Sequence, residues 1–224
     1  MSEMTIAVLG GTGKEGKGLA YRWAKAGYRV LIGSRSEEKA RAAAQELSSL
    51  LGGKAVVEGM TNLAAAQKAD VAVLTVPYAA HRETLESVKD ALKGKLLIDV
   101  TVPLVPPKVT KVQMPPAGSA AQEAQAILGP DVPLASAFQN ISYEHLISDE
   151  PAACDVLVTG TGKEAREQAI GLVAAAGLTG WDAGPIENSV VAEGLTSVLI
   201  HINKQYGSTH AGIKLTGVEK RSAD

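Results

Sequence analysis

The chain has 224 residues, enough for one domain with a full core or for one domain with a small appendage. Its 22 lysines and arginines nearly balance 24 aspartates and glutamates, which argues against a nucleic-acid binder because such proteins carry a basic face. The charges are evenly spread, and no apolar run approaches the roughly 20 residues of a membrane span. With one cysteine and no signal-peptide pattern, we expect a cytoplasmic protein without contact to membranes.

Short aliphatic runs alternate with longer helical patterns over the first hundred residues. We expect strands over 5–9, 29–32, 55–58, 71–75 and 96–100, and helices over 14–26, 37–51, 63–67 and 81–91. Strands that are apolar throughout are typical of a parallel sheet covered on both faces. This alternation predicts an α/β fold of the Rossmann type, with a doubly wound and mostly parallel sheet.

The second half begins after a loop with five prolines at 101–118. We expect further helices over 119–128 and 163–176, and strands over 133–137, 155–159 and 180–182. A last helical pattern over 186–206 starts after Pro185 and stops before Gly207. We predict a Rossmann-type domain over 1–130 and a smaller α/β domain over 131–224, which ends in a long helix and completes the ligand cleft.

The last helical pattern carries apolar residues on more than one face. A helix of this kind is buried between domains or between subunits. We therefore predict a homodimer, with the C-terminal domain forming the interface.

A glycine motif, Gly11-x-Gly13-x-x-Gly16, lies between the first predicted strand and the first predicted helix. In such motifs the first glycine allows a tight turn, the second lets a pyrophosphate approach, and the third allows close packing of the helix on the strand. The N-terminus of the helix offers unpaired N–H groups to the phosphates. A glycine-rich turn that binds nothing is the alternative, which the strand and helix on either side make less favourable. The predicted cofactor contacts here are Gly11, Thr12, Gly13, Lys14 and Glu15.

The end of the second predicted strand distinguishes NADP from NAD. An NAD-binding protein places an acidic residue there to bind the ribose hydroxyls, whereas this chain has Ser34, Arg35 and Ser36. An arginine can pair with a 2′-phosphate through two hydrogen bonds, and the serines can add hydroxyl donors. A surface ion pair is the less favoured alternative for Arg35. Lys39 adds a charge to the phosphate or is a solvated cation of the helix. The sequence therefore predicts NADP as the cofactor.

The loops after the fourth and fifth predicted strands lie at the carboxyl edge of the sheet, where doubly wound folds bind ligands. They contain Thr75, Val76 and Pro77 in one loop and Thr101 in the other. For Val76 and Pro77, direct contact with a ligand and simple loop rigidity remain about equally favoured. Thr101 is a candidate hydrogen-bond partner of the nicotinamide carboxamide.

Histidine and cysteine give no sign of other chemistry. The four histidines show no metal-binding spacing, so we expect no metal site. His201, among apolar neighbours of the last helix, is expected to be a packed or interface histidine, and Cys154 a structural thiol.

Several stretches carry a resemblance to a known family. They are 8–13 with 16–20, 33–35 with 39–40, 72–78, 182–185 with 188–189, and 212–214. Over nearly its whole length the chain resembles the NADPH-dependent F420 reductases, also called F420H2:NADP oxidoreductases. These enzymes pass hydride between NADP(H) and a 5-deazaflavin coenzyme, F420. The first two stretches are shared by many dinucleotide reductases, and the last two are more specific to this family.

The resemblance implies that the protein mainly positions two rings for hydride transfer, so no catalytic side chain is predicted. Val76 and Pro77 would shape the nicotinamide side, and Phe138, Gln139 and Asn140 would face the second ring. Because the coenzyme carries phosphate and carboxylates, a cation such as Lys214 is a candidate contact, as are Lys204 and His210, and a surface role is equally open for each.

One position departs from the family. Its members commonly carry histidine where this chain has Gln139, which can form hydrogen bonds but cannot titrate near neutrality. Two alternatives therefore stay open. The first is an NADPH-dependent reductase of another acceptor, such as a flavin, a ferric chelate, an imine or a small carbonyl compound. The second is a non-catalytic NADP(H) sensor.

Overall fold

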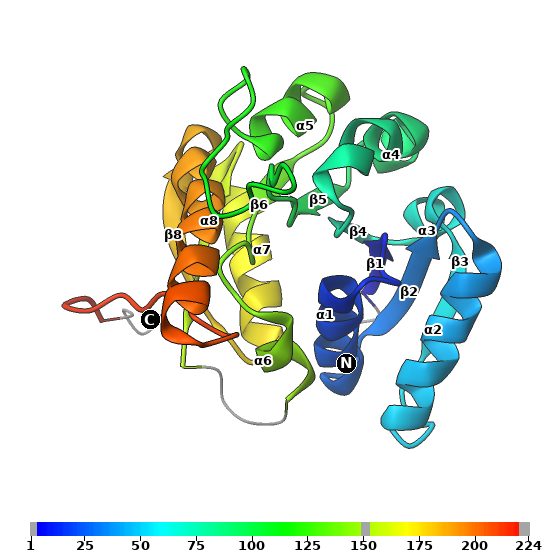
Figure 1. Cartoon of the computed structure of the whole chain (residues 1–224). Coiled ribbons are helices and arrows are strands. Elements are labelled where there is room, and N and C mark those ends of the chain that lie inside the picture. Colours follow the sequence, from blue (N-terminus) through cyan, green and yellow to red (C-terminus); the bar gives the residue numbers. More distant parts are fainter. Residues whose placement is uncertain (1–3, 149–152, 220–224) are drawn as a thin grey trace.

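The computed structural model describes residues 4–148 and 153–219, and its centre is an eight-stranded sheet (Figure 1). The strands lie side by side in the order β3-β2-β1-β4-β5-β6-β7-β8, and every neighbouring pair is parallel except β6 with β7. The strand bounds are β1 Thr5–Leu9, β2 Arg29–Ser34, β3 Val57–Thr61, β4 Val71–Leu74, β5 Leu96–Asp99, β6 Leu134–Ser136, β7 Asp155–Gly160 and β8 Thr179–Pro185.

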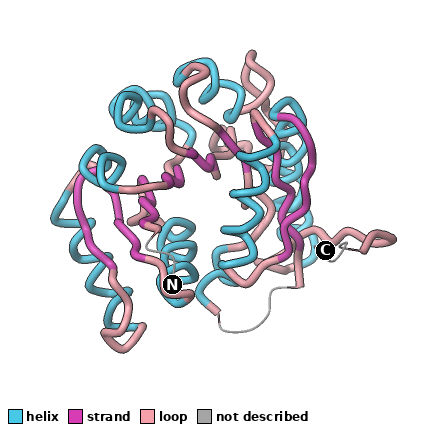
Figure 2. The backbone as a smooth tube through the Cα atoms, turned by 180° about the vertical axis from the view of Figure 1, so that it is seen from behind, coloured by secondary structure: helices cyan, strands magenta, loops and turns pink. Residues whose placement is uncertain are grey.

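Helices pack on both faces of the sheet (Figures 1 and 2). Their bounds are α1 Lys14–Lys25, α2 Glu37–Leu50, α3 Asn62–Lys68, α4 His81–Val88, α5 Ala120–Leu128, α6 Tyr143–Ile147, α7 Lys163–Ala175 and α8 Ser189–Tyr206, with 3-10 turns at Tyr78–Ala80, Lys89–Leu92 and Ile186–Asn188. Alternate residues of one strand pack into two separate hydrophobic cores, because successive side chains point to opposite faces of the sheet. Ile6 and Val8 pack with α1, α2 and α7, whereas Ala7 and Leu9 pack with α3, α4 and α5.

The predicted fold class is confirmed: the sheet is doubly wound and mostly parallel, and the chain ends its regular structure in a long helix. The proline-rich loop at 101–118 contains no helix or strand, as expected. Some boundaries were wrong. The third strand, expected over 55–58, lies at Val57–Thr61; the last strand, expected over 180–182, spans Thr179–Pro185; and the last helix opens with a 3-10 turn before α8.

The short helix α6 was not predicted. Ser142 caps it, its side chain accepting a hydrogen bond from the backbone N–H of Glu144. The Arg22 guanidinium of α1 donates hydrogen bonds to the backbone oxygens of His145, Leu146 and Ser148. Because α6 has only five residues, this long-range anchoring rather than a sequence periodicity fixes it.

Backbone hydrogen bonding crosses the predicted domain boundary. β5 pairs with β6, and β6 pairs with β7, so one sheet runs through both halves of the chain. The division at residue 130 stays a prediction. Within residues 4–148 and 153–219, no helix has the length and apolar character to cross a membrane.

Candidate functional site

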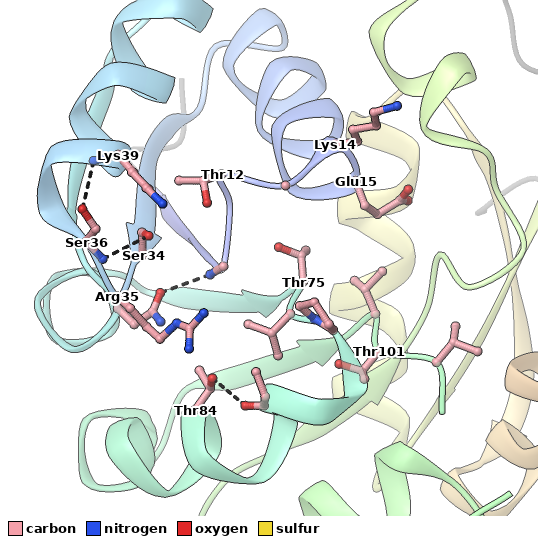
Figure 3. Close-up of a pocket in the computed structure, with 18 of the residues that line it drawn as sticks. Thr12, Lys14, Glu15, Ser34, Arg35, Ser36, Lys39, Thr75, Thr84 and Thr101 are labelled. Atoms are coloured by element: carbon pink, nitrogen blue, oxygen red, sulfur yellow. Dashed lines mark hydrogen bonds between the residues drawn. The ribbon is translucent and has the colours of Figure 1, made fainter. Parts of the chain in front are cut away.

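A cavity of about 560 Å³ lies at the carboxyl ends of β1, β2, β4 and β5 (Figure 3). This volume is in the range of small-molecule and cofactor sites. All of the predicted cofactor residues except Gly11 line it, together with seven other residues. The lining residues are Gly10, Thr12, Gly13, Lys14, Glu15, Ser34, Arg35, Ser36, Lys39, Asn62, Thr75, Val76, Pro77, Ala80, Thr84, Val100, Thr101, Val102 and Leu104.

The glycine loop has the shape that a pyrophosphate requires. A Cβ on Gly16 would lie 2.6 Å from Thr75 Oγ1 and 2.7 Å from the Cα of Gly11, so only glycine allows α1 to approach β4 this closely. A Cβ on Gly13 would meet nothing nearer than the Gly10 oxygen at 3.9 Å. Its missing side chain thus leaves open space at the start of α1, where backbone N–H groups can approach a phosphate.

Gly11 lies behind the loop rather than against the cavity. Its N–H donates to the backbone oxygens of Val8, at 3.2 Å, and Gly33, at 3.0 Å. A Cβ here would lie 2.7 Å from the Val8 oxygen, so the residue makes the tight turn after β1. Direct contact of Gly11 with a cofactor stays a prediction.

The end of the cavity next to β2 is cationic. Ser36 caps α2, its Oγ accepting from the backbone N–H of Lys39 at 3.4 Å, and Ser34 Oγ accepts from the N–H of Ser36 at 3.3 Å. Arg35 and Lys39 are exposed and form no ion pair with any described residue. Two unpaired cations beside two hydroxyls at a helix N-terminus can bind a phosphate.

Asn62, the first residue of α3, is a lining residue that sequence reasoning missed. Its Oδ1 accepts the backbone N–H of Gly10 at 3.1 Å and so holds the glycine loop to the end of β3. It directly follows β3 and therefore reaches the carboxyl edge of the sheet, but this signal was hidden because the third strand was predicted to end at residue 58.

At the other end of the cavity, the lining residues that follow β4 and β5 are all uncharged. Thr75 Oγ1 donates to the Leu9 oxygen at 3.0 Å, and the backbone N–H of Thr101 donates to Asp99 Oδ1 at 2.9 Å. Thr101 Oγ1 is buried and has no hydrogen-bond partner in the described part of the chain. A buried hydroxyl without a partner in the wall of a cavity is available to a ligand.

Buried polar contacts hold this second end in place. His81 Nε2 lies 2.7 Å from Asp99 Oδ2, and both side chains are 1% exposed. Glu193 of α8 accepts from the backbone N–H groups of Ala120 and Ala121, at 2.7 and 3.1 Å, which binds α8 to the start of α5. Burial raises the pKa of Glu193 to about 8, although these two hydrogen bonds act in the opposite direction.

Glu15 stands in the first turn of α1. Burial raises the pKa of its carboxyl to about 8, and its Oε1 has no partner among residues 4–148 and 153–219. A carboxyl with a raised pKa in a cavity wall is a candidate functional group.

The residues predicted for the second substrate lie outside this cavity. Phe138 has a φ of 74°, and its buried ring packs edge-on against Trp23, 5.9 Å between centroids. Gln139 Nε2 donates to the Asp99 oxygen at 2.9 Å and to Ser136 Oγ at 2.8 Å. Asn140 Nδ2 donates to the Ala192 oxygen of α8 at 2.8 Å.

Lys214 lines a second cavity of about 340 Å³, together with His145, Ser148, Ala153, Cys154, His210, Gly212 and Ile213. The structure therefore does not bring Lys214 into the first cavity. Contact of residues 138–140 and of Lys214 with a second substrate stays a prediction.

Two minor predictions have clear outcomes. Cys154 is buried, and burial raises the pKa of its thiol, as expected of a structural cysteine. His201 is exposed on α8, so the prediction that it packs within this chain is wrong, and an interface role stays open. The described residues contain no group of three or more potential ligands that could hold a metal ion.

A doubly wound sheet, a glycine loop opening α1 and a cavity across the carboxyl edge define a dinucleotide-binding protein of the Rossmann type. The comparisons with known proteins narrow this class. Residues 5–103 match the family described as NADP oxidoreductase, coenzyme F420-dependent. The F420-dependent NADP reductase of Methanocaldococcus jannaschii is 39% identical over 96% of this chain and 100% of its own length. That of Methanothermobacter marburgensis is 40% identical over 96% and 99%. The chain therefore belongs to the F420-dependent NADP reductase family.

One solved structure carries the same family name, and another shares the fold. A putative F420-dependent NADP reductase from Arthrobacter sp. FB24 has a TM-score of 0.79 at 26% identity, covering 95% of this chain and 99% of its own. A pyrroline-5-carboxylate reductase from Coxiella burnetii has a TM-score of 0.57 at 18% identity, covering 93% of this chain and 73% of its own. The second likeness concerns the fold alone.

Proposed function

We propose that this chain is an oxidoreductase that transfers hydride between NADP(H) and the deazaflavin coenzyme F420. The observation that carries the proposal is the identity of 39% and 40%, over nearly the full length, with two reductases of that name. The cavity supports it independently, since it combines a phosphate-binding glycine loop with free cations next to β2.

We assign the 2′-phosphate of NADP(H) to the β2 end of the cavity. Arg35 and Lys39 would neutralise its charge, and Ser34 and Ser36 would donate hydroxyl hydrogen bonds. The N-terminus of α1, with the open space at Gly13, would hold the pyrophosphate, together with Thr12 and Lys14.

The nicotinamide belongs at the other end, over β4 and β5. Val76 and Pro77 would support one face of the ring, and the unpartnered Thr101 hydroxyl would bind its carboxamide. When bound, the cofactor supplies or accepts the hydride at this ring. The residues around it exclude water and fix the distance between the rings, which is the main requirement of a direct transfer.

We place the acceptor ring beside the segment 138–140. Gln139 Oε1 is buried and without a partner in the described part of the chain, so it can accept a hydrogen bond from a ring N–H. Lys214, His145 and His210 in the second cavity could bind anionic groups of the acceptor's side chain.

We further propose a homodimer. α8 exposes apolar side chains at helical spacing, with Val191 60%, Val198 43% and Ile202 37% exposed. A second copy of the chain would cover this stripe, which a monomer leaves in contact with water. Sedimentation at micromolar concentration tests this, and a monomer would contradict it. A cytoplasmic location, which the unpaired Cys154 suits, is checked by cell fractionation.

The direct test of the function is spectrophotometry. NADPH is mixed with oxidised F420, and in a parallel assay with FMN, while both chromophores are followed. We expect turnover with F420 and little or none with FMN. Turnover with FMN alone would point to another acceptor, and NADPH binding without any turnover would favour a sensor.

A further inference from the structure

Glu15 has a carboxyl that the proposed function does not yet use. It lines the first cavity, and its Oε1 is buried without a hydrogen-bond partner among the described residues. Native proteins rarely leave such an atom unsatisfied. An unsatisfied atom in the wall of a ligand cavity is expected to act on the ligand.

The position of Glu15 decides which part of the cofactor it meets. β2 and β5 lie three strand spacings apart in the sheet, about 14 Å, with β1 and β4 between them. The 2′-phosphate at Arg35, next to β2, therefore leaves the nicotinamide over β4 and β5. The first turn of α1 lies against β4, since a Cβ on Gly16 would be 2.6 Å from Thr75 Oγ1. Figure 3 shows Glu15 on the same side as Thr75 and away from Arg35 and Lys39.

Neither cation next to Glu15 on α1 forms an ion pair with it, although Lys14 also lines the cavity. On α1, Lys14 Nζ lies 3.1 Å from the Tyr143 hydroxyl of α6, and Lys17 Nζ lies 3.0 Å from Glu46 of α2. On α6, Glu144 is held by the Thr209 hydroxyl at 2.6 Å. The cavity residues contributed by the ends of β4 and β5 are all uncharged, namely Thr75, Val76, Pro77, Val100, Thr101, Val102 and Leu104.

Burial raises the pKa of Glu15 to about 8, so the carboxyl is protonated at neutral pH. Charge at this end of the cavity therefore changes only when the ligand brings it. A nicotinamide ring is neutral when reduced and cationic when oxidised.

We propose that Glu15 couples its own charge to the redox state of the nicotinamide, keeping its proton beside the reduced ring and releasing it to solvent beside the oxidised ring. This inference rests on the proposed binding of NADP(H) and adds a residue that distinguishes its two redox states. The new carboxylate pairs with the ring cation across the cavity, whereas beside NADPH it would stand uncompensated.

The sign of the pH effect follows from linkage. A cation within about 4–6 Å lowers the pKa of a carboxyl by about 1–3 units, so Glu15 titrates lower in the NADP+ complex than in the NADPH complex, which carries the same phosphates. A ligand whose complex holds fewer protons binds more tightly as pH rises. Between pH 6 and pH 8 the affinity for NADP+ should therefore rise by about tenfold relative to that for NADPH.

Calorimetric titration measures the proton directly. NADP+ and NADPH are titrated into the protein at pH 7 in two buffers of different ionisation enthalpy, which gives the number of protons released on binding. The 2′-phosphate is common to both ligands, so its own protonation cancels in the comparison. The wild type should release a fraction of a proton more with NADP+ than with NADPH.

Two variants decide the assignment. In Glu15→Gln the difference between the ligands should vanish and the ratio of their affinities should become independent of pH. Glu38→Gln, an exposed carboxyl of α2 outside the cavity, should behave as the wild type. Equal proton release for both ligands in the wild type would overturn the inference even if no variant folded, and so would a difference that persists in Glu15→Gln. Absence of binding by either ligand would instead refute the proposed function.

Discussion

At the β2 end of the cavity the lining residues are neighbours in the chain, whereas at the β4 and β5 end they are held by buried contacts that join different helices and strands. Ser34, Arg35 and Ser36 follow one strand directly, and their arrangement needs only β2 and the capped start of α2. Thr101 depends on Asp99, which in turn is held by His81 of α4. The first end is thus a local and exposed feature that works by charge, and the second is a buried one that works by position.

The largest effect is expected from a substitution at the buried β4 and β5 end of the cavity. Asp99→Ala leaves His81 and the N–H of Thr101 without their acceptor inside the core. We expect the free energy of unfolding to fall by about 3 kcal/mol, measured by urea denaturation. The exposed Asp90, which pairs with Lys93 on the surface, provides the control, because Asp90→Ala should leave stability unchanged. Equal losses of unfolding free energy in both variants would show that the buried His81–Asp99 contact contributes no more to stability than the exposed Asp90–Lys93 pair.

The next largest effect is expected from a substitution at the cationic β2 end of the cavity. Arg35→Ala should weaken NADPH by about 30-fold, or about 2 kcal/mol, because a charge-assisted pair with the 2′-phosphate is lost. NADH lacks this phosphate, so its affinity should stay the same. Dissociation constants from fluorescence titration measure both, and Arg41→Ala, a cation of α2 paired with Glu37, is the matched control. If NADPH and NADH lose affinity equally, Arg35 does not bind the phosphate.

A smaller effect sharpens the comparison. Thr101→Val removes the hydroxyl proposed to bind the carboxamide, which both NADPH and NADH carry. Both should weaken about fivefold, or about 1 kcal/mol, because one neutral hydrogen bond is lost. The same titrations apply, and a loss confined to NADPH would contradict the assignment of Thr101 to the nicotinamide end.

The smallest effect concerns Lys39, which is exposed on the first turn of α2. Lys39→Ala should weaken NADPH about twofold, since a solvated charge contributes about 0.5 kcal/mol. High salt should abolish this difference. A loss as large as that of Arg35→Ala would mean that the two cations hold the phosphate as a pair.

The same contrast explains what the sequence could predict. The fold class and the β2 end follow from short stretches, because strand, glycine loop and helix cap are encoded by neighbouring residues. Glu193 accepts hydrogen bonds from the backbone of Ala120 and Ala121, which lie 73 and 72 positions away in the sequence. No local sequence pattern predicts such a contact. Phe138 shows the limit most clearly. The resemblance implied that it faces the second ring, which stays a prediction, and no local pattern indicated its positive φ or the packing of its ring on Trp23.

The one antiparallel pair of the sheet has a practical consequence. Because β7 runs against β6, Thr161 lies beside Leu134, and the turn from β7 to α7 emerges at the edge opposite the cavity. This turn is exposed around Thr161 and Lys163. A fluorescent label attached there would report on tumbling and assembly in solution while every ligand-facing surface of the carboxyl edge stays untouched.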